Sequence, residues 1–317
     1  MAKVDVLVPC YNYGRFLTDC VKSVLTQSIQ DVRVLIIDDA SSDDTVEVAT
    51  RLKAADARVE FMQHARNRGH IRTYNEGIEW ASGEYFLLLS ADDLLVPHAL
   101  ERATSVMDRN PDIVLTFGEC ATWRECSPFP EVWPMRDYSW TRFNLLNEMC
   151  TFAANLVPTP TAIVRTNVQK TIGGYREALP HSGDMEMWLR FAANGAVARI
   201  DAVQAIYRKH ETAMSNSYCA EMLFDYRQRY LAFESFFIEY GPRLKGSGEL
   251  KLLAQRKLAR KLFRDGVGLL RRGQLSRGLR YLREWTELNP RASSFWPVPA
   301  RNVANSLHPS SRTTEEG

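Results

Sequence analysis

The chain has 317 residues, of which 45% are hydrophobic and 25% charged, a composition that excludes a collagen-like or largely disordered protein. Its 40 lysines and arginines nearly balance 38 aspartates and glutamates, so we expect no binding to nucleic acid. No apolar stretch approaches the roughly 18–20 residues of a membrane span, and residues 1–5 lack a signal-peptide core. We therefore expect a cytoplasmic protein, or one bound peripherally to the inner face of the cytoplasmic membrane.

The first 120 residues alternate short apolar runs with segments in which apolar residues recur at helical spacing. The apolar runs predict β-strands at residues 4–8, 32–37, 59–63, 85–89 and 113–117. The helical spacing predicts helices at 15–27 and 71–80, one starting at Pro97, and one capped by Ser41 and Ser42. Strands separated by helices form right-handed βαβ units, so we expect an α/β fold with a doubly wound, mostly parallel, Rossmann-like sheet.

The middle of the chain breaks this pattern. Residues 122–160 are rich in proline and aromatic residues and predict a long irregular segment, which in a compact domain is usually functional. Periodicity returns at 161–164 and in a predicted helix at 185–194. We expect the domain that begins at residue 1 to end near residue 217.

The C-terminal part is predicted to be a helical extension at 218–307, followed by a disordered tail at 308–317. Residues 243–301 contain 15 Lys and Arg against 4 Asp and Glu, a net charge of +11. Leucines stand among these cations at helical spacing, as in a helix that lies on an anionic membrane surface. The leucines would equally pack on the preceding domain and leave the cations in solvent, and the sequence leaves both readings open.

Polar clusters follow three of the predicted strands. They are Pro-Cys-Tyr-Asn at 9–12, Asp-Asp at 38–39 and Ser-Ala-Asp-Asp at 90–93. In an open α/β sheet ligands bind beyond the carboxyl ends of the strands, so we expect the clusters to meet in one crevice. Adjacent carboxylates raise each other's pKa unless something compensates, and Mg²⁺ or Mn²⁺ is the usual compensating cation. Alternatively, each acidic pair only caps the helix that follows it.

Four motifs stand in order in this part of the chain. They are Val-Leu-Val-Pro-Cys-Tyr-Asn at 6–12, Ile-Ile-Asp-Asp-Ala-Ser-Ser-Asp at 36–43, Asn-Arg-Gly at 67–69 with Asn-Glu-Gly at 75–77, and Leu-Leu-Leu-Ser-Ala-Asp-Asp at 87–93. Together they resemble the inverting glycosyltransferases of family 2, which have the GT-A fold. The resemblance implies a catalytic domain at 1–217, with a nucleotide-binding part at about 1–120 and an acceptor part at about 121–217.

The resemblance implies roles for residues of the nucleotide site. Pro9, Tyr11 and Asp39 would hold the nucleotide, with Tyr11 stacked on the base and Asp39 accepting a base N–H. Asn12 and Asn67 would line the same nucleotide-sugar site. A carboxylate only accepts hydrogen bonds, which favours uridine, although thymidine presents the same donor and a guanine edge also offers one.

A second group of residues would handle the diphosphate. Asp92 matches the closing acid of the family's Asp-x-Asp element and would bind Mn²⁺ or Mg²⁺, with Asp93 in support or in contact with the donor. Ser90 stands where many relatives carry the first aspartate, which leaves the metal requirement open. His210, in Tyr-Arg-Lys-His at 207–210, would contact the diphosphate or complete the metal shell, or is only a surface histidine after a strand.

The catalytic base is expected in His-Ser-Gly-Asp-Met-Glu-Met-Trp-Leu-Arg at 181–190, which resembles the family's Glu-Asp pair before a Trp-Leu-Arg helix. Asp184 matches the base, which takes the acceptor hydroxyl's proton as that hydroxyl attacks the anomeric carbon. Gly183 replaces the preceding glutamate of the family. Glu186 is the competing base, and an aspartate before a helix is often only an N-cap.

The resulting hypothesis is an inverting hexosyltransferase that moves a sugar from a nucleoside-diphosphate sugar, expected to be a UDP-sugar, to a glycan or lipid-linked acceptor. The alternative, suggested by Ser90 and Gly183, is a catalytically weak or inactive nucleotide-sugar-binding protein of the same fold. A nucleotidyltransferase is disfavoured because Cys-Tyr-Asn-Tyr-Gly at 10–14 is no Gly-rich, basic phosphate loop. Fold alone decides none of this, so the site residues must.

Overall fold

The structure is a computed structural model that describes residues 3–125, 127–130, 138–213 and 222–289. Its strands are β1 Val4–Cys10, β2 Val32–Asp38, β3 Val59–Gln63, β4 Tyr85–Leu88, β5 Leu94–Leu95, β6 Ile113–Arg124, β7 Ser139–Arg142, β8 Ile163–Arg165 and β9 Ala196–Lys209. Its helices are α1 Gly14–Leu25, α2 Thr45–Ala55, α3 His70–Trp80, α4 Ala99–Arg109, α5 Leu145–Phe152, α6 Thr166–Ile172, α7 Gly183–Asn194, α9 Met222–Glu239, α10 Ser247–Arg271 and α11 Leu275–Leu288. Short 3₁₀ helices cover Thr159–Thr161 and Gly241–Arg243.

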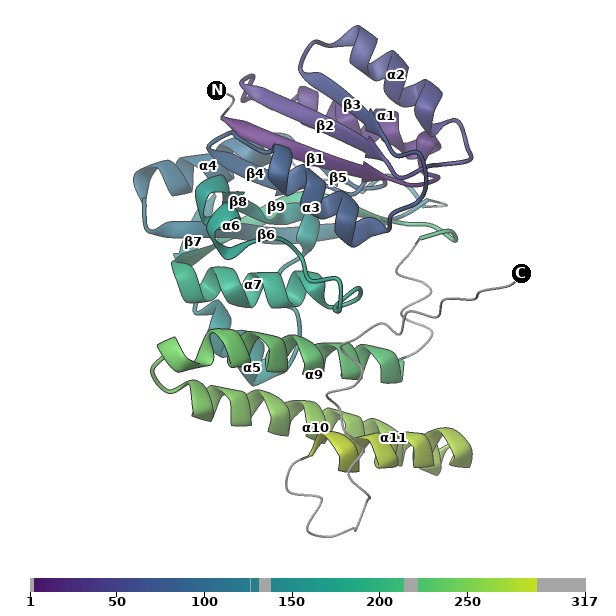
Figure 1. Ribbon diagram of the computed structural model, residues 1–317, viewed down its shortest axis with the longest axis vertical. Helices are drawn as coiled ribbons and strands as arrows, with labels where there is room; N and C mark the ends of the chain where they lie inside the picture. Colours follow the sequence, from purple (N-terminus) through teal and green to yellow (C-terminus); the bar gives the residue numbers. More distant parts are fainter. Residues whose placement is uncertain (1–2, 126, 131–137, 214–221, 290–317) are drawn as a thin grey trace, which may run out of the picture. The chain divides into compact units, whose positions relative to one another are not determined.

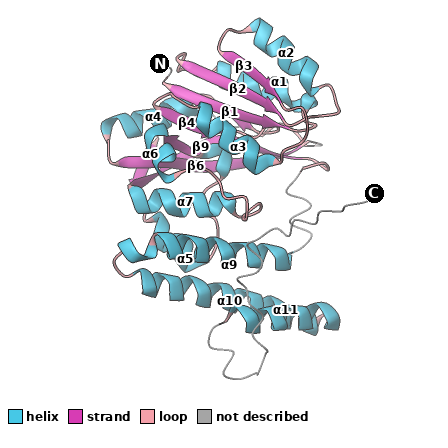
Figure 2. Cartoon of the chain, viewed as in Figure 1, coloured by secondary structure: helices cyan, strands magenta, loops and turns pink. Residues whose placement is uncertain are grey.

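The strands form one mixed sheet in the order β3-β2-β1-β4-β8-β6-β9-β5, with β7 paired to β9 (Figure 1). Strands β3, β2, β1 and β4 are parallel, β8 runs antiparallel between β4 and β6, and β6 is parallel to β9. Figure 2 shows helices on both sides of the parallel strands. Because each crossover helix returns the chain to the same edge of the sheet, the carboxyl ends of β1, β2 and β4 lie together. The predicted α/β fold with a mostly parallel sheet is confirmed.

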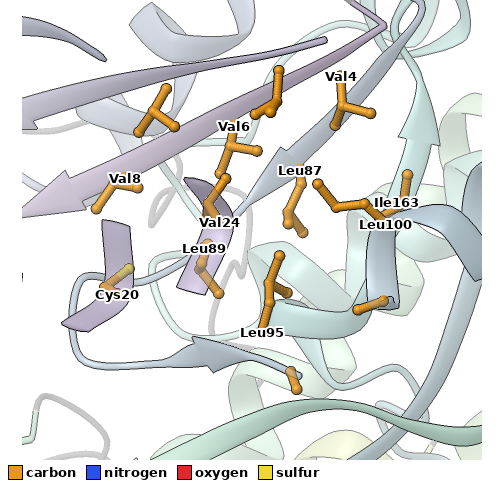
Figure 3. Packing of buried hydrophobic residues seen from close by; sticks show 14 of the residues in the cluster. Val4, Val6, Val8, Cys20, Val24, Leu87, Leu89, Leu95, Leu100 and Ile163 are labelled. Atoms are coloured by element: carbon orange, nitrogen blue, oxygen red, sulfur yellow. The ribbon is translucent and has the colours of Figure 1, made fainter. Parts of the chain in front are cut away.

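The core of the parallel half comes from alternation in β1 and from the apolar face of α1. Val4, Val6 and Val8 are fully buried and point to one side of the sheet, because successive strand residues alternate between its faces. Figure 3 shows Val6, Val24 of α1 and Leu89 gathered in this core. Full burial of such a side chain stabilises the fold by about 1.5–3 kcal/mol. The packing therefore fixes the strand ends that carry the polar clusters.

The predicted cap of the second helix is wrong in detail. Helix α2 begins at Thr45, and the side chain of its N-cap residue Asp44 makes no capping hydrogen bond. Ser41 and Ser42 hydrogen-bond to the loop after β1 instead. Asp43 accepts a 3.0 Å hydrogen bond from the Thr45 backbone N–H. The two serines therefore join the loops after β1 and β2, whereas Asp43 meets the first N–H of α2.

The segment predicted to be irregular is regular over much of its described length. Strand β6 continues to Arg124 and pairs with β9, and β7 and α5 follow. From Glu119 onward every β6 side chain is exposed or half-buried, so this half of the strand lacks the continuous apolar run that marks the others. For β9 the sequence indicated only a strand before His210 and not its full length, because polar residues such as Gln204 and Arg208 interrupt its apolar positions. Residues 126 and 131–137 lie outside the described part.

The chain divides into two compact units, one ending at Ala254 and the other beginning at Gln255. Helix α9, which was expected to open the separate extension, belongs to the first unit, where it packs on α7 and buries Phe233 and Phe236. The first unit therefore reaches beyond the expected boundary at residue 217. In the second unit α10 and α11 approach closely at Gly278, where a Cβ would lie 2.5 Å from the Leu270 side chain. The predicted disordered tail lies outside the described residues.

Candidate active site

A cavity of about 1120 Å³ lies at the carboxyl ends of the parallel strands. Most of the residues predicted for the site line it, namely Pro9, Tyr11, Asn12, Asp39, Asn67, Asp92, Asp93 and Asp184. Two predicted residues do not: His210 lies behind Asp92, which it contacts, and Glu186 lies elsewhere in the core of α7. The structure therefore brings together residues that are as much as 175 positions apart in the sequence.

Asn12 braces the loop that carries Tyr11. The Asn12 backbone has a φ of 58°, a left-handed conformation that asparagine tolerates better than most residues. Its side-chain Oδ1 accepts from the Ser42 N–H at 2.8 Å, and its own N–H donates to Ser41 Oγ at 2.8 Å. Tyr11 keeps 48% of its surface exposed. Hydrogen bonds to Ser41 and Ser42 thus fix the loop, while the Tyr11 ring stays exposed and can contact a ligand.

Asp39 is a buried carboxylate held by three partners. Its Oδ1 accepts from the Arg68 N–H at 2.7 Å and lies 2.7 Å from His64 Nδ1. Its Oδ2 accepts from the Gly69 N–H at 2.9 Å. Each carboxylate oxygen offers about two acceptor positions, so one position on Oδ2 remains for a ligand.

Asp92 and Asp93 follow β4 side by side but have different partners. Asp93 is buried, and its Oδ1 accepts from the Arg208 N–H of β9 at 3.1 Å. Burial, together with the neighbouring Asp92 charge, raises the pKa of Asp93 well above its ordinary value. Asp92 instead lies against His210, with Oδ2 3.1 Å from Nε2. Asp93 therefore anchors β9, and Asp92 is the acid of the pair that lies next to a histidine.

The side chains of Asp92 and His210 are the ones that could bind a divalent cation at this site. His210 Nδ1 lies 2.9 Å from Thr212 Oγ1; if Nδ1–H donates there, the Nε2 lone pair faces the Asp92 carboxylate. A carboxylate oxygen beside an imidazole nitrogen is a donor pair that a divalent cation can share, whereas in the other tautomer Nε2–H donates to Asp92 and no cation is needed. Within the described residues no cluster of three or more acidic, histidine or cysteine side chains is set to hold a metal. A bound cation would therefore need further ligands from substrate or water.

Asp184 stands in the first turn of α7 and is held from both oxygens. Oδ1 accepts from the Met185 N–H at 2.7 Å, and Oδ2 accepts from Asn155 Nδ2 at 2.8 Å and Thr159 Oγ1 at 3.2 Å. Burial raises its pKa, and the hydrogen bonds offset this only in part. Helix α7 has Ser182 as its N-cap residue, with no side-chain cap bond. Asp184 is thus an oriented carboxylate on the cavity wall with a strengthened affinity for a proton.

Glu186 has a structural place instead. Its side chain is fully buried, accepting from Arg176 Nε at 2.7 Å and from Arg190 Nε at 2.9 Å. Arg190 also donates to the Ile172 and Gly174 carbonyls at the end of α6. Two residues along a helix differ by about 200° in direction, which separates Glu186 from Asp184. The geometry favours Asp184 over Glu186 as the group that meets a substrate.

Sequence reasoning missed several residues of the cavity. Arg15 is the sole arginine or lysine among the described lining residues, and its position three residues after the first motif was a usable signal. Asn155 and Thr159, which hold Asp184, come from a segment that the sequence presented as irregular. Tyr74 and Tyr175 also line the cavity with their rings edge to face at 5.3 Å, and their spacing in the sequence gives no sign of this pairing.

Comparison with known proteins decides the family. Residues 5–155 match the family model described as glycosyl transferase family 2. Over these residues the chain belongs to glycosyltransferase family 2. The chain is accordingly a glycosyltransferase, so the predicted family and the prediction of a glycosyltransferase are confirmed. The matched stretch contains all four motifs and the loop that supplies Asn155.

Individual relatives agree with this assignment. An uncharacterized glycosyltransferase of Haemophilus influenzae is 25% identical over 222 residues, which are 68% of each protein. A GalNAc(5)-diNAcBac-PP-undecaprenol beta-1,3-glucosyltransferase of Campylobacter jejuni is 33% identical over 126 residues, 39% of this chain and 40% of that protein. The structure of S. aureus TarS 1–349 in complex with UDP-GlcNAc matches with a TM-score of 0.66 at 20% identity, covering 92% of this chain and 83% of that one. The last likeness is one of fold, and it confirms the GT-A-type architecture.

Proposed function

We propose that this glycosyltransferase transfers a sugar from a UDP-sugar to a glycan or lipid-linked acceptor and inverts the anomeric configuration. The observation that carries the proposal is the convergence of Asp39, Asp92 and Asp184 on one cavity. Such a reaction needs three groups that these carboxylates can supply. Asp39 would recognise the nucleotide base, Asp92 would bind a cation, and Asp184 would accept the proton of the acceptor hydroxyl. In this proposal residues 1–120 bind the nucleotide and residues 121–217 bind the acceptor.

Uridine is proposed because of the acceptor position left on Asp39. The uracil imino N–H is a single donor that this position can take, and Tyr11 offers its exposed ring to the face of the base. Arg15, half-exposed beside the same cavity, supplies a cation for the diphosphate. The UDP-GlcNAc bound to TarS supports a uridine donor, while the sugar is left for experiment.

The proposed chemistry uses Asp184 as the general base. The acceptor hydroxyl oxygen attacks the anomeric carbon from the face opposite the diphosphate, and the carbon–oxygen bond to the phosphate breaks with its electron pair leaving on the diphosphate. The hydroxyl proton passes to the Asp184 carboxylate. Asn155 and Thr159 hold that carboxylate in place, and burial raises its pKa. A base with a pKa nearer to the working pH takes a proton more effectively.

Mn²⁺ or Mg²⁺ would be held by Asp92 and His210, whose facing atoms are 3.1 Å apart. A site with one or two protein ligands, completed by substrate phosphates, is common for Mg²⁺. When bound, the cation would offset the charge that develops on the leaving diphosphate. Ser90, which lines the cavity, contributes a neutral hydroxyl where an acid is usual in the family.

A lipid-linked acceptor is supported by the Campylobacter relative, which is named for a GalNAc(5)-diNAcBac-PP-undecaprenol substrate. Such an acceptor belongs to polysaccharide and cell-envelope synthesis. Tyr74, which lies outside the 121–217 part, and the largely buried Tyr175 line the cavity edge to face, and we propose that these rings meet the acceptor sugar. These rings and the loop at 155–160 are therefore the proposed acceptor contacts.

The donor proposal is tested by a panel of nucleotide sugars in thermal unfolding, with and without Mn²⁺. A UDP-sugar at 100 times its dissociation constant should add about 2.7 kcal/mol to the unfolding free energy, and ADP- or CDP-sugars should add little. Asp39→Ala should remove the stabilisation, whereas Asp44→Ala, which changes an exposed aspartate nearby, should keep it. Release of UDP during incubation separates a transferase from a binder. Preference for an adenine or cytosine nucleotide would refute the uridine proposal.

The C-terminal helices are proposed to contact an anionic membrane surface. In the second unit Leu275 and Leu279 of α11 are 63% and 61% exposed, among Arg277, Arg280 and Arg283. Leu262, by contrast, is buried, so part of the leucine stripe serves packing. No described helix has the length and apolarity to cross a membrane.

Each Lys or Arg near an anionic surface contributes about 1 kcal/mol, so changing three arginines should be visible in liposome pelleting. We expect the full chain to pellet with anionic vesicles at low salt and to stay soluble with neutral ones. Charge reversal at Arg277, Arg280 and Arg283 should release it, and reversal at the exposed Arg51, Arg72 and Arg109 should have a smaller effect. A protein that remains in the supernatant at low salt would leave the helices as a structural appendage.

A further inference from the structure

His64 follows β3 and lies between two carboxylates of the nucleotide side. Its Nδ1 is 2.7 Å from Asp39 Oδ1, and its Nε2 is 2.7 Å from Glu76 Oε2 on α3. Its backbone N–H donates to the Asp38 carbonyl at 2.9 Å, which fixes the start of the loop. The imidazole itself is buried and is absent from the cavity lining. His64 therefore acts on any ligand only through Asp39.

Both ring nitrogens of His64 face an acceptor. A neutral imidazole donates from one nitrogen only, whereas the doubly protonated form donates from both. Burial lowers the pKa of His64, but the hydrogen bonds and charges of Asp39 and Glu76 outweigh it and raise the pKa above its ordinary value. Asp39 and Glu76 are the titratable groups that face the ring, and Arg68 pairs with the far side of Glu76.

The arrangement sets the rotation of the Asp39 carboxylate. His64 and the Arg68 N–H occupy both acceptor positions of Oδ1, and the Gly69 N–H occupies one of the two on Oδ2. The two backbone donors are neighbours on one loop, so they restrain the carboxylate from one side. His64 Nδ1 approaches Asp39 from another direction. With this third donor in place, a single acceptor position, on Asp39 Oδ2, stays open.

We propose that His64 is a positioning residue that, by donating to Asp39 and Glu76 at once, aims the remaining Asp39 lone pair at the imino N–H of the nucleotide base. This inference rests on the proposed uridine donor. His64 would then affect the selectivity for the nucleotide base rather than the transfer step. Its ring contacts Asp39 and Glu76, and neither Asp92 nor Asp184.

Three substitutions separate the two hydrogen bonds of His64. Asparagine places an amide NH₂ close to the position of Nδ1 and so keeps the donor to Asp39. Glutamine places its NH₂ close to the position of Nε2 and keeps only the donor to Glu76. Alanine removes both. His64→Asn and His64→Gln carry the same functional group, so a difference between them reports the Asp39 bond rather than a general loss of packing.

The test measures the dissociation constants of UDP and of UDP methylated at N3 of uracil, with Mn²⁺, for the full chain and each folded variant. The wild type should bind UDP at least about tenfold more tightly than the methylated probe, as expected for a hydrogen bond to a charged group. His64→Asn should keep this ratio within about threefold. His64→Gln and His64→Ala should bring the ratio close to one, chiefly by weakening UDP, with turnover at saturating donor changed much less.

Three results would overturn the inference, and they differ in whether the uridine proposal falls with it. If the wild type prefers UDP to the methylated probe and every His64 variant keeps that preference, His64 does not orient Asp39 and the uridine proposal stands. If the wild type itself does not distinguish the two probes, the reading of uridine by Asp39 fails together with the inference. Equal weakening of both probes in His64→Asn and His64→Gln would show a structural role only and also overturns it.

Discussion

Replacing Asp184 with asparagine is expected to cut turnover by about 10²–10⁴-fold, the usual contribution of a general base, while donor affinity stays near its wild-type value. Asparagine keeps the size of the side chain and a carbonyl that can accept from Asn155 or Thr159, but it cannot take the acceptor's proton. Stopped-flow or coupled measurement of UDP release at saturating donor gives the turnover. Titration with UDP gives the affinity.

The pH profile adds an independent check on Asp184. A general base works when it is deprotonated, so activity should be present above its pKa and lost as the pH falls through it. Because burial raises this pKa, the acid limb should lie above the value of about 3.9 for an unperturbed aspartate. In Asp184→Asn the residual activity should lack that limb.

Glu186→Gln is the matched control, since it makes the same chemical change two residues along α7. Its expected effect is on stability: breaking a buried ion pair costs about 3–5 kcal/mol, and Arg190 would lose its charged partner. Turnover of the molecules that remain folded should change little. If Glu186→Gln slows turnover more than Asp184→Asn in folded protein, the wrong carboxylate has been assigned.

Replacing Asp92 with alanine is expected to reduce transfer by about 10³-fold or more, because a bound cation contributes several kcal/mol of charge stabilisation. His210 would remain as a lone ligand without its carboxylate partner. Donor-dependent UDP release is the measurement, and excess chelator should reproduce the loss in the wild type.

Ser90→Ala is the control for this experiment, because Ser90 stands at the position of the missing acid and lines the same cavity. If the serine hydroxyl is not a ligand, this variant should keep most of its activity and its response to chelator. Full wild-type activity in excess chelator would show instead that the cation is dispensable in a chain that carries Ser90.

The sequence predicted the parallel half of the sheet because its strands are buried on both faces and read as continuous apolar runs. Strand β9 differs from these strands because some of its buried side chains are polar. Gln204 is fully inside, yet it is polar, and it is tolerated because Arg102 and the Ala99 carbonyl satisfy it. A polar residue with such distant partners cannot be distinguished in sequence from an exposed one. The packing of α9 on α7 is likewise a long-range contact that the sequence does not show.

In the site, too, the residues of local motifs were predicted and their distant hydrogen-bond partners were not. Pro9, Tyr11, Asp39 and Asp92 were placed by motifs that end strands, and strand ends have a fixed meaning in an open α/β sheet. Their supporting partners were not placed. His64 is 25 positions from Asp39, and Asn155 is 29 positions from Asp184. Hydrogen bonds across such distances depend on how loops fold back, which no local pattern encodes.

The most direct test of the account is a crystal structure with Mn²⁺ and the UDP-sugar that gives the largest thermal stabilisation. The account predicts the uracil imino N–H on Asp39 Oδ2, the cation on Asp92, and Asp184 on the face of the anomeric carbon opposite the diphosphate. Asp184 lying on the same face as the diphosphate, or outside reach of that carbon, would contradict the inverting mechanism. A base bound away from Asp39 would contradict the assignment of the nucleotide site.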